Sequence, residues 1–431
     1  MKLLTVKWSL FLTKKLLKNS FIFVLGDVLN KAVPFFMLPV LTRYLTPEDY
    51  GIISLFTVFV SILAVFTGLS IHGAINVNFF KMKKDDLKVF IGNCIIILNV
   101  STFIVLFFIY MLHPLIIEKL NIGIEWIFVG VVLAFSQFLT TINLLLWMAE
   151  EKPKPYSIYQ ISQTLTVTLL SLTLIVGFRM NWEGQLIATT IGTLLFSIIS
   201  FVFIIKRGYL IFQPKKEYMK DALQFGVPLI PHALASWVIT GADRIVIMGI
   251  LGTSATGIYA VGYQIGMIMG VLVTALNKAW NPYIYKILST NPTLKDKKKI
   301  VKFTYIYFIG IFLFAIIFSK ISELLIPYFL GEKFTEATKF ILYFSITFSF
   351  QGMYFMVTNY IFYVKKTHIL AYVTFSTALL HLGLLYLLVN TNGSIGAAQA
   401  NIITFAVTFF IVWILANKSY PMPWKNWSLN V

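Results

Sequence analysis

Twelve long apolar stretches run through the chain, and they constrain its fold more than any other feature. They lie near residues 20–43, 50–74, 89–112, 125–148, 157–178, 185–205, 222–249, 257–277, 303–319, 337–362, 368–389 and 395–416. The hydrocarbon core of a bilayer is about 30 Å thick, and about 20 apolar residues in an α-helix cross it. Hydrophobic residues make up 58% of the chain and charged residues only 12%, unlike in soluble domains. The sequence therefore predicts an all-α polytopic membrane protein with twelve transmembrane helices.

Lysine and arginine residues favour one orientation of these helices. If both termini lie inside, most of the 35 basic residues fall in the inner segments, and loops rich in Lys and Arg stay in the cytoplasm. The net charge of +18 then reflects topology rather than nucleic-acid binding, which would need a clustered basic face. The first 20 residues are basic and lack a cleavage pattern. They predict a retained, interfacial helix rather than a signal peptide.

Four short motifs of the first half recur in the second half in the same order. The pairs are LTPEDYGIISLF (45–56) with LGTSATGIYAVG (251–262), KDD (84–86) with KDK (295–297), KPYSIY (154–159) with KTHILA (366–371), and WEGQLIA (182–188) with SIGAAQA (394–400). The offset stays between 206 and 212 residues. Each half holds six spans, so both halves enter the membrane in the same direction, as in transporters built from parallel repeats. We expect two six-helix lobes, residues 1–213 and 214–431.

Four charged residues stand out among the ionisable residues of the predicted spans, because a charge at the helix centre costs about 2.5–3.5 kcal/mol. Asp27 and Lys31 lie on the first span, four residues apart, so the two side chains can form an ion pair on one helix face. Asp243 and Arg244 lie on the seventh span, which is equivalent to the first in the repeat. These four residues are the candidates for function.

Two interpretations of these charges stay open. The charges either neutralise one another and only fix helix packing, or the first helix of each lobe lines a wet cavity. Each of the two spans contains a pair of prolines: Pro34 and Pro39, Pro228 and Pro231. Interior prolines bend helices and free carbonyl groups, which suits a cavity lining. A polar stripe on the seventh span also favours a cavity lining: His232, Ser236, Thr240 and Asp243.

Motifs for chemistry are lacking in the sequence. It contains neither a P-loop nor a nucleophile elbow, and its histidines are scattered without the spacing of metal ligands. We therefore expect no catalytic residue, no metal site, no cofactor and no nucleic-acid partner. The adjacent acids Glu48 and Asp49 in RYLTPEDYG belong to a turn instead. Thr46 is a good N-cap, Pro47 fits the first helical position, and an acid at 49 completes a capping box.

Several of these stretches together resemble the bacterial polysaccharide flippases of the multidrug/oligosaccharidyl-lipid/polysaccharide exporter superfamily. The resemblance rests on LPVLTRYLTPEDYGIISLF, TGLSIHGAI (67–75), FGVPLIPHALASWVITGADRIVI (225–247), NKAWNPYIY (277–285), LGEKFTEA (330–337) and GSIGAAQA (393–400). It implies a protein of the cytoplasmic (inner) membrane that moves O-antigen or capsule repeat units, linked to undecaprenyl pyrophosphate, by alternating access. Such a flippase works with ion coupling, in lipopolysaccharide or capsule synthesis, among membrane lipids. Contact with the polysaccharide polymerase and the chain-length machinery is a further expectation.

Carried over by position, the resemblance assigns roles to the charged residues. Lys31 and Arg244 become partners for the pyrophosphate or for acidic sugars, and Arg43 and His232 belong to the same cavity. Asp27 and Asp243 become proton or cation sites. Such flippases often carry a basic residue near the end of the second span, where this chain has His72 and then Asn76.

Two other functions stay open. The first is a drug or cation antiporter of the same superfamily, which would favour acidic cavity residues. The second is a membrane-embedded polysaccharide polymerase or glycosyltransferase, which would need a large outer loop with catalytic residues. The longest predicted outer segment, residues 320–336, is short for that task.

Overall fold

The computed structural model describes residues 14–120 and 122–425. Its α-helices are α1 (Lys14–Tyr44), α2 (Pro47–Gly68), α3 (His72–Phe79), α4 (Lys84–Leu120), α5 (Ile124–Ala149), α6 (Pro153–Leu172), α7 (Trp182–Lys206), α8 (Lys216–Gly226), α9 (Ile230–Leu251), α10 (Thr253–Ser289), α11 (Leu294–Phe329), α12 (Ile341–Tyr363), α13 (His368–Asn392) and α14 (Ser394–Ser419). Three short turns join them: the π-helical η2 (Thr173–Gly177) and the 3-10 turns η3 (Val227–Leu229) and η4 (Glu332–Phe340). Most of the predicted interfacial helix at residues 1–20 lies outside the described residues.

Twelve helical segments in the described part of the chain are long and apolar enough to cross a membrane. They coincide with the twelve predicted spans, so the predicted fold class is confirmed. Several helices are longer than the spans: α10 has 37 residues and α11 has 36. A helix rises about 1.5 Å per residue, so both helices are longer than a bilayer core is thick.

Two predicted spans differ from the helices in detail. The second span was expected to run to residue 74, but α2 ends at Gly68 because Leu69 and Ser70 adopt left-handed backbone angles. The short α3 follows this turn. The seventh span is split into α8 and α9 by η3, next to two prolines that cannot donate backbone hydrogen bonds. α8 packs against α3 and α4. The division of the chain at residues 213 and 214 stays a prediction.

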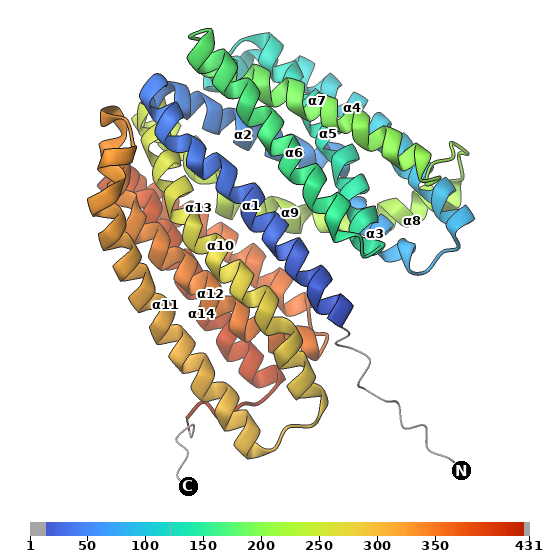
Figure 1. Ribbon diagram of the computed structural model, residues 1–431, viewed down its shortest axis with the longest axis vertical. Helices are drawn as coiled ribbons and strands as arrows, with labels where there is room; N and C mark the ends of the chain where they lie inside the picture. Colours follow the sequence, from blue (N-terminus) through green and yellow to red (C-terminus); the bar gives the residue numbers. More distant parts are fainter. Residues whose placement is uncertain (1–13, 121, 426–431) are drawn as a thin grey trace.

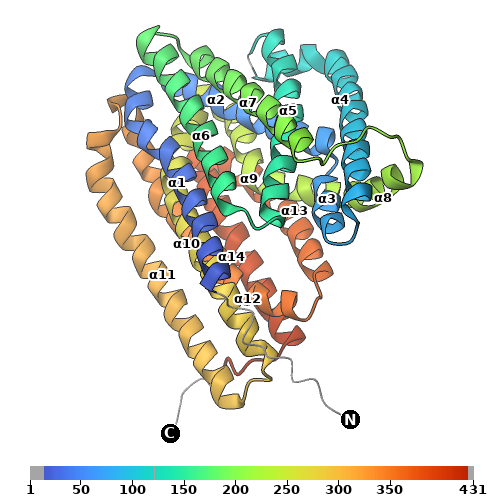
Figure 2. The same cartoon turned by 45° about the vertical axis from the view of Figure 1, so that its right-hand side comes forward.

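The membrane helices form two bundles, named here the N-lobe (α1–α7) and the C-lobe (α9–α14). In the N-lobe, α5 packs between α2 and α7, and α6 packs against α1 and α7. In the C-lobe, α12 packs against α10, α11 and α14, and α13 packs against α9 and α14. The bundles meet where α1 ends and α2 begins, and they diverge toward the other end (Figures 1 and 2). We call these the closed end (residues 44–53 and 251–259) and the open end (residues 69–83 and 290–293).

Two glycines let α2 and α10 cross at the closed end. A methyl group on Gly51 would lie 2.1 Å from the carbonyl oxygen of Thr253, and one on Gly257 would lie 1.8 Å from that of Pro47. Small residues permit such close approach of two helix backbones. The two contacts are reciprocal, since each glycine follows, by four residues, the carbonyl that the other glycine approaches. The crossing is therefore locally symmetric, and it joins the two positions that the predicted repeat pairs, Gly51 and Gly257.

A capping box starts α2 at the closed end, as the sequence predicts. The Thr46 amide donates to Asp49 Oδ2 at 2.8 Å, and the Asp49 amide donates to Thr46 Oγ1 at 3.2 Å. Pro47 occupies the first turn. Asp49 is buried, and the Thr46 hydroxyl also donates to its Oδ2 at 2.7 Å. The two adjacent acids of this turn thus serve the helix start.

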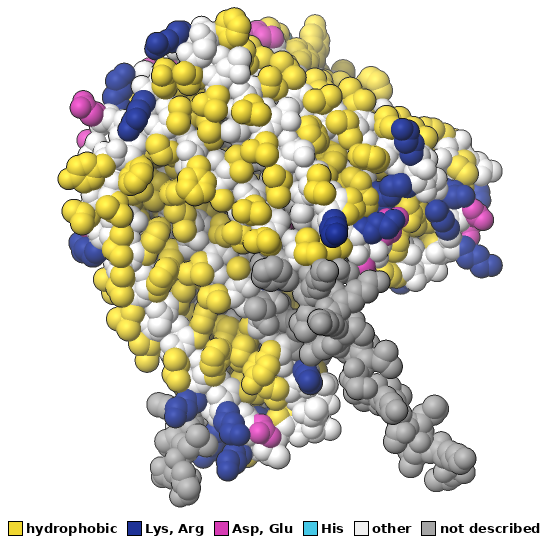
Figure 3. Space-filling view, in the orientation of Figure 1, with side chains coloured by type: hydrophobic (Ala, Val, Ile, Leu, Met, Phe, Trp, Pro, Cys, Tyr) yellow, Lys and Arg dark blue, Asp and Glu magenta, His cyan; other side chains and the backbone are white. Residues whose placement is uncertain are grey.

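The surface of the molecule fits a bilayer. Hydrophobic side chains cover most of the face in Figure 3, and Lys and Arg gather toward its margins. Large apolar side chains on the outside of α4 and α11, such as Phe103, Phe107 and Ile309, are more than half exposed. In water such a surface would be unfavourable, whereas lipid chains cover it without cost.

Candidate functional site

Two adjoining pockets lie directly below the crossing of α2 and α10. One lies between the lobes, and the other is lined by the N-lobe and by Gln264 of the C-lobe. Each has a volume of about 290 Å³, and they share Tyr50, Ile53 and Gln264. Hydroxyl and amide side chains contribute much of the remaining wall: Ser54, Thr57, Ser61, Gln163, Thr164, Thr168, Ser171, Gln185 and Thr240. Such groups can both donate hydrogen bonds to neutral polar molecules and accept them. We call the two pockets together the central cavity.

Arg244 is the one charged residue among the described residues that line the central cavity. One guanidinium nitrogen donates to the Thr240 carbonyl at 2.9 Å, one turn earlier in α9. The guanidinium carbon lies 4.7 Å from the centre of the Tyr263 ring, a cation–π contact. These two contacts fix the side chain without neutralising its charge. The structure thus places Arg244 in the cavity wall, and its role in substrate binding stays a prediction.

Trp237 joins the two lobes at the rim of this cavity. Its indole N–H, on α9, lies 3.2 Å from the Val58 carbonyl and 3.0 Å from Ser61 Oγ, both on α2. The sequence alone gave no reason to select Trp237. Gln163 and Gln185 were likewise not singled out, although a glutamine within an apolar span is a signal that could have drawn attention to them.

Asp27 forms an ion pair across the lobe boundary rather than with Lys31. Lys278 on α10 lies 2.5 Å from Asp27 Oδ2 on α1. Both side chains are partly exposed, at 27% for Asp27 and 43% for Lys278. The i, i+4 pair within α1 was therefore the wrong partner assignment, because a residue 251 positions away reaches the same carboxylate. Asp27 and Lys278 tie α1 to α10 on the open-end side of the central cavity.

Lys31 and Arg43 lie elsewhere on α1. Lys31 is exposed, and within the described residues it has no ion-pair partner. Arg43 is exposed at the last turn of α1. Next to it, Thr42 accepts a hydrogen bond from the amide of Gly331 at 3.1 Å. This contact docks the end of α1 on the C-lobe at the closed end, while neither basic residue lines the central cavity.

Asp243 points into the C-lobe, away from its neighbour Arg244. Its Oδ2 accepts hydrogen bonds from the Tyr259 hydroxyl at 2.5 Å and from Asn401 Nδ2 at 2.7 Å. His381 Nε2 lies 2.8 Å from Oδ1. The carboxylate is only 2% exposed and His381 is fully buried. A buried carboxylate is stable only when it is paired and hydrogen-bonded in this way. We call these four residues the buried network.

A further pocket connects to the buried network from inside the C-lobe. It measures about 260 Å³ and lies between α9, α12, α13 and α14. His232 lines it, together with Thr404, and Thr404 Oγ1 lies 3.0 Å from His381 Nδ1. The geometry thus places His232 in this C-lobe pocket and not in the central cavity. His381, one of the scattered histidines of the sequence, links the pocket to Asp243.

A second charged cluster lies at the open end of the N-lobe. Glu150 accepts a hydrogen bond from the Tyr209 hydroxyl at 2.8 Å, and its other oxygen lies 3.0 Å from both Arg207 and Lys152. Burial raises the pKa of Glu150, but these three donors together lower it more, so its pKa falls below the ordinary value of 4.5. Burial and the bond to Glu150 raise the pKa of Tyr209 to about 12. The sequence did not single out this cluster.

Comparisons with known proteins agree with this fold. Residues 16–288 match the family described as polysaccharide biosynthesis protein. The chain is 26% identical over 376 residues to an uncharacterized membrane protein of Haemophilus influenzae, covering 86% of this chain and 89% of that protein. It is 25% identical to the capsular polysaccharide biosynthesis protein CapF of Staphylococcus aureus, covering 79% and 84%.

Solved structures with the same fold are multidrug transporters. The inward-facing conformation of a multidrug resistance MATE family transporter of the MOP superfamily superimposes with a TM-score of 0.69 and 14% identity, covering 91% of this chain and 98% of that one. The outward-facing conformation of such a transporter gives a TM-score of 0.59 over 94% and 95%. The chain therefore belongs to the polysaccharide biosynthesis protein family of multi-pass membrane proteins, built on the MATE transporter fold.

Proposed function

We propose that the protein is a flippase that carries an oligosaccharide repeat unit, linked to a polyprenyl diphosphate, from the inner to the outer leaflet of the bacterial cytoplasmic membrane. The termini then lie in the cytoplasm, the open end faces the cytoplasm, and the two lobes rock to expose the cavity on the other side. The observation that carries this proposal is the set of polar groups in the central cavity: beside its apolar residues, the wall offers neutral hydroxyl and amide groups and one cation, Arg244.

The cavity suits the head of such a lipid. A sugar chain and a diphosphate cannot enter hydrocarbon, because their polar groups would lose water without gaining partners. Amides and hydroxyls from both lobes replace that water for the sugar. Arg244 offers a planar, charged donor to a phosphate, the group that arginine binds best. Lys31 and Lys278 lie toward the open end, from which the head would enter.

The lipid tail would leave the protein beside α1. An apolar groove of about 430 Å³ lies between α1, α10 and α11 near the closed end. Phe35, Phe36 and Pro39 line it, whereas Pro34, Met37 and Leu41 of the same helix line the central cavity. Helices α1 and α10 thus line both spaces, so a lipid can place its head on the cavity side of α1 and its tail on the groove side.

Ion coupling would reside in the C-lobe. Asp243 and His381 are titratable, they lie within hydrogen-bonding distance, and Thr404 connects them to a polar pocket. A proton gained or lost in the buried network changes the hydrogen bonds that join α9, α10, α13 and α14. Since α9 and α10 also contact α2 of the N-lobe, such a change can bias the arrangement of the lobes. We propose a proton as the coupling ion.

The test is a leaflet-exposure assay with the purified full-length protein in liposomes. The probe is a polyprenyl-diphosphate-linked oligosaccharide with a terminal labelled sugar, which an impermeant glycosidase removes from the outer leaflet. The wild type should make the inner pool accessible. Arg244→Gln should slow this about tenfold, because a hydrogen bond to a charged group contributes about 1.5–3 kcal/mol. Arg244→Lys should recover part of the rate, and Lys320→Gln, an exposed change on α11, should leave it unaltered.

The proposal is overturned if the wild type exposes the probe no faster than protein-free liposomes do, or if Arg244→Gln exposes it as fast as the wild type.

The rival function is drug efflux, which the MATE fold of the solved neighbours favours. Efflux of a cationic dye from the same liposomes tests it. We expect none, because a single arginine repels cations and the described cavity lining offers no carboxylate to bind them.

A further inference from the structure

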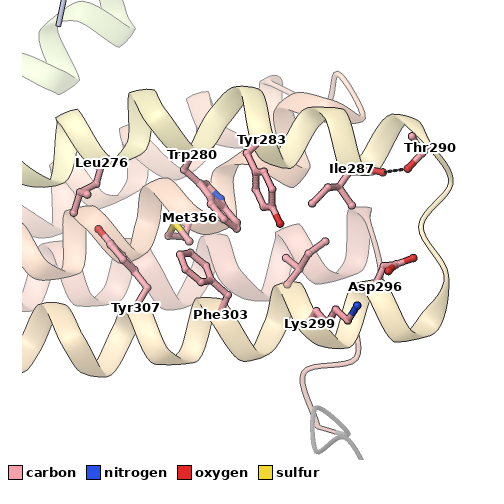
Figure 4. Close-up of a pocket in the computed structure, with 11 residues that line it drawn as sticks. Leu276, Trp280, Tyr283, Ile287, Thr290, Asp296, Lys299, Phe303, Tyr307 and Met356 are labelled. Atoms are coloured by element: carbon pink, nitrogen blue, oxygen red, sulfur yellow. Dashed lines mark hydrogen bonds between the residues drawn. The ribbon is translucent and has the colours of Figure 1, made fainter. Parts of the chain in front are cut away.

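α10 and α11 follow one another in the chain, yet they leave a deep groove between them. Both helices pack on α12 and have little direct backbone contact with each other. Near the open end the groove widens into a pocket of about 730 Å³, within the range of about 300–1,000 Å³ that is usual for ligand pockets. Side chains of both helices point into it, and α12 forms the floor (Figure 4). They include Leu276, Trp280 and Tyr283 of α10, Lys299, Phe303 and Tyr307 of α11, and Met356 of α12.

This pocket lies on the opposite side of α10 from the lobe boundary. Lys278 pairs with Asp27 of α1 across that boundary. Leu276 and Trp280 are each two residues from Lys278, which places them more than half a turn around the helix. The pocket therefore opens toward the surrounding bilayer and is separate from the central cavity.

The walls of the pocket change from aromatic to charged toward the open end. Trp280 stacks on Phe303 with ring centres 4.7 Å apart and planes at 13°, and Tyr283 is 55% exposed. Tryptophan and tyrosine side chains are favoured at the level of lipid head groups. Beyond these rings, near the loop that joins α10 to α11, lie Asp296 and Lys299 (Figure 4).

Lys299 is available to a ligand, whereas Asp296 is occupied. The Asp296 carboxylate accepts hydrogen bonds from the amide and the hydroxyl of Thr293, where it caps α11. Within the described residues no carboxylate lies at ion-pair distance from Lys299. The first turn of α11 also carries Lys295. Together these features give a positive mouth above an apolar groove at the membrane surface.

We propose that this pocket binds an anionic glycerophospholipid of the leaflet at the open end. The phosphate contacts Lys299, and the acyl chains lie along Trp280, Phe303 and Leu276. Basic pockets between membrane helices at the cytoplasmic side recognise acidic head groups in this way. The occupant is a resident lipid and not the transported one, because the pocket faces away from the central cavity. The inference is independent of what the central cavity carries.

The test is native mass spectrometry of the delipidated, full-length protein titrated with phosphatidylglycerol or with phosphatidylcholine. The wild type should retain phosphatidylglycerol preferentially. Lys299→Gln should lower its retention about fivefold, because one lysine near an anionic head group contributes about that factor. The matched control is Lys302→Gln, which removes the same charge from the same helix outside the pocket and should change retention little.

A second variant tests the position of the acyl chains. Leu276→Trp adds bulk to the groove at a side chain that is already 43% exposed, so the fold is retained, as thermal unfolding will verify. It should lower retention of both lipids. Equal retention by Lys299→Gln and Lys302→Gln, equal retention of the two lipids by the wild type, or full retention by Leu276→Trp would each overturn the proposal.

Discussion

The two lobes share the geometry of the closed end but differ in their interiors. Gly51 and Gly257 occupy equivalent positions in the crossing of α2 and α10. At the same offset of 206 residues, Asp243 corresponds to Met37 and Tyr259 to Ile53. The C-lobe thus buries a carboxylate and the tyrosine that donates to it where the N-lobe has apolar side chains. In the predicted repeat, the contact that joins the lobes is thus shared, while the side chains inside the lobes differ in polarity.

The two lobes also differ in where their charged clusters lie relative to the membrane spans. The charged cluster of the N-lobe, Glu150 with Arg207, lies at the open end outside the membrane spans. The buried network of the C-lobe lies between its membrane helices. The N-lobe wall of the central cavity offers neutral groups such as Gln163, Thr164 and Gln185. In our proposal the N-lobe therefore contacts mainly sugar, while the C-lobe responds to protons.

Substitutions at the crossing of α2 and α10, which both lobes share, should have the largest effect on flipping. Gly51→Val and Gly257→Val should each reduce flipping to the protein-free rate, because either side chain would collide with a backbone carbonyl of the other lobe. Equal loss in both variants is expected from the symmetry. The control is Gly249→Val on α9, where a methyl group would meet no atom within 4 Å. Flipping by either crossing variant at the wild-type rate would mean that the close contact is not needed for the transport cycle.

The buried network of the C-lobe, which has no counterpart at the equivalent N-lobe positions, should give the next largest effect on flipping. Asp243→Asn keeps the shape of the side chain but removes its negative charge and its capacity to bind a proton. We expect flipping to fall about tenfold and to lose its response to an imposed pH gradient, since replacing one member of a buried, paired set is costly. Met37→Leu, at the equivalent N-lobe position, should preserve the response. The measurement is the leaflet-exposure rate with and without the gradient. An Asp243→Asn variant that still follows the gradient would exclude the buried network as the coupling site.

The sequence predicts what depends on local patterns. Apolar runs of sufficient length give the twelve spans, and the Thr46–Asp49 spacing gives the capping box, because both depend on neighbours within a few residues. The partners of Asp27 and Asp243 could not be predicted. Lys278 and His381 reach these carboxylates from distant helices, and a single histidine in an apolar span gives no sign of which helix it will meet. Only the packing of α9, α10, α13 and α14 brings the buried network together.

The N-lobe cluster should affect stability more than transport. Glu150→Gln should lower the free energy of unfolding by about 1 kcal/mol at pH 7, because the ionised carboxylate accepts charged hydrogen bonds that an amide cannot. The pKa of Glu150 is lowered in the folded protein, so this stability is present above the unfolded pKa and is lost as pH falls through the folded one. The difference in melting temperature between wild type and variant should therefore shrink below pH 4.5. A constant difference from pH 7 to pH 3 would contradict the assignment.

The smallest effect should come from the pair that joins the lobes. Asp27 and Lys278 are both partly exposed, and exposed ion pairs contribute about 0.2–1 kcal/mol. A double-mutant cycle with Asp27→Asn and Lys278→Gln should give a coupling of about twofold in the flipping rate. Lys31→Gln is the matched control, since it removes a charge from the same helix without breaking the pair. If Asp27 couples to Lys31 and not to Lys278, the ion pair belongs to α1 alone and does not join the lobes.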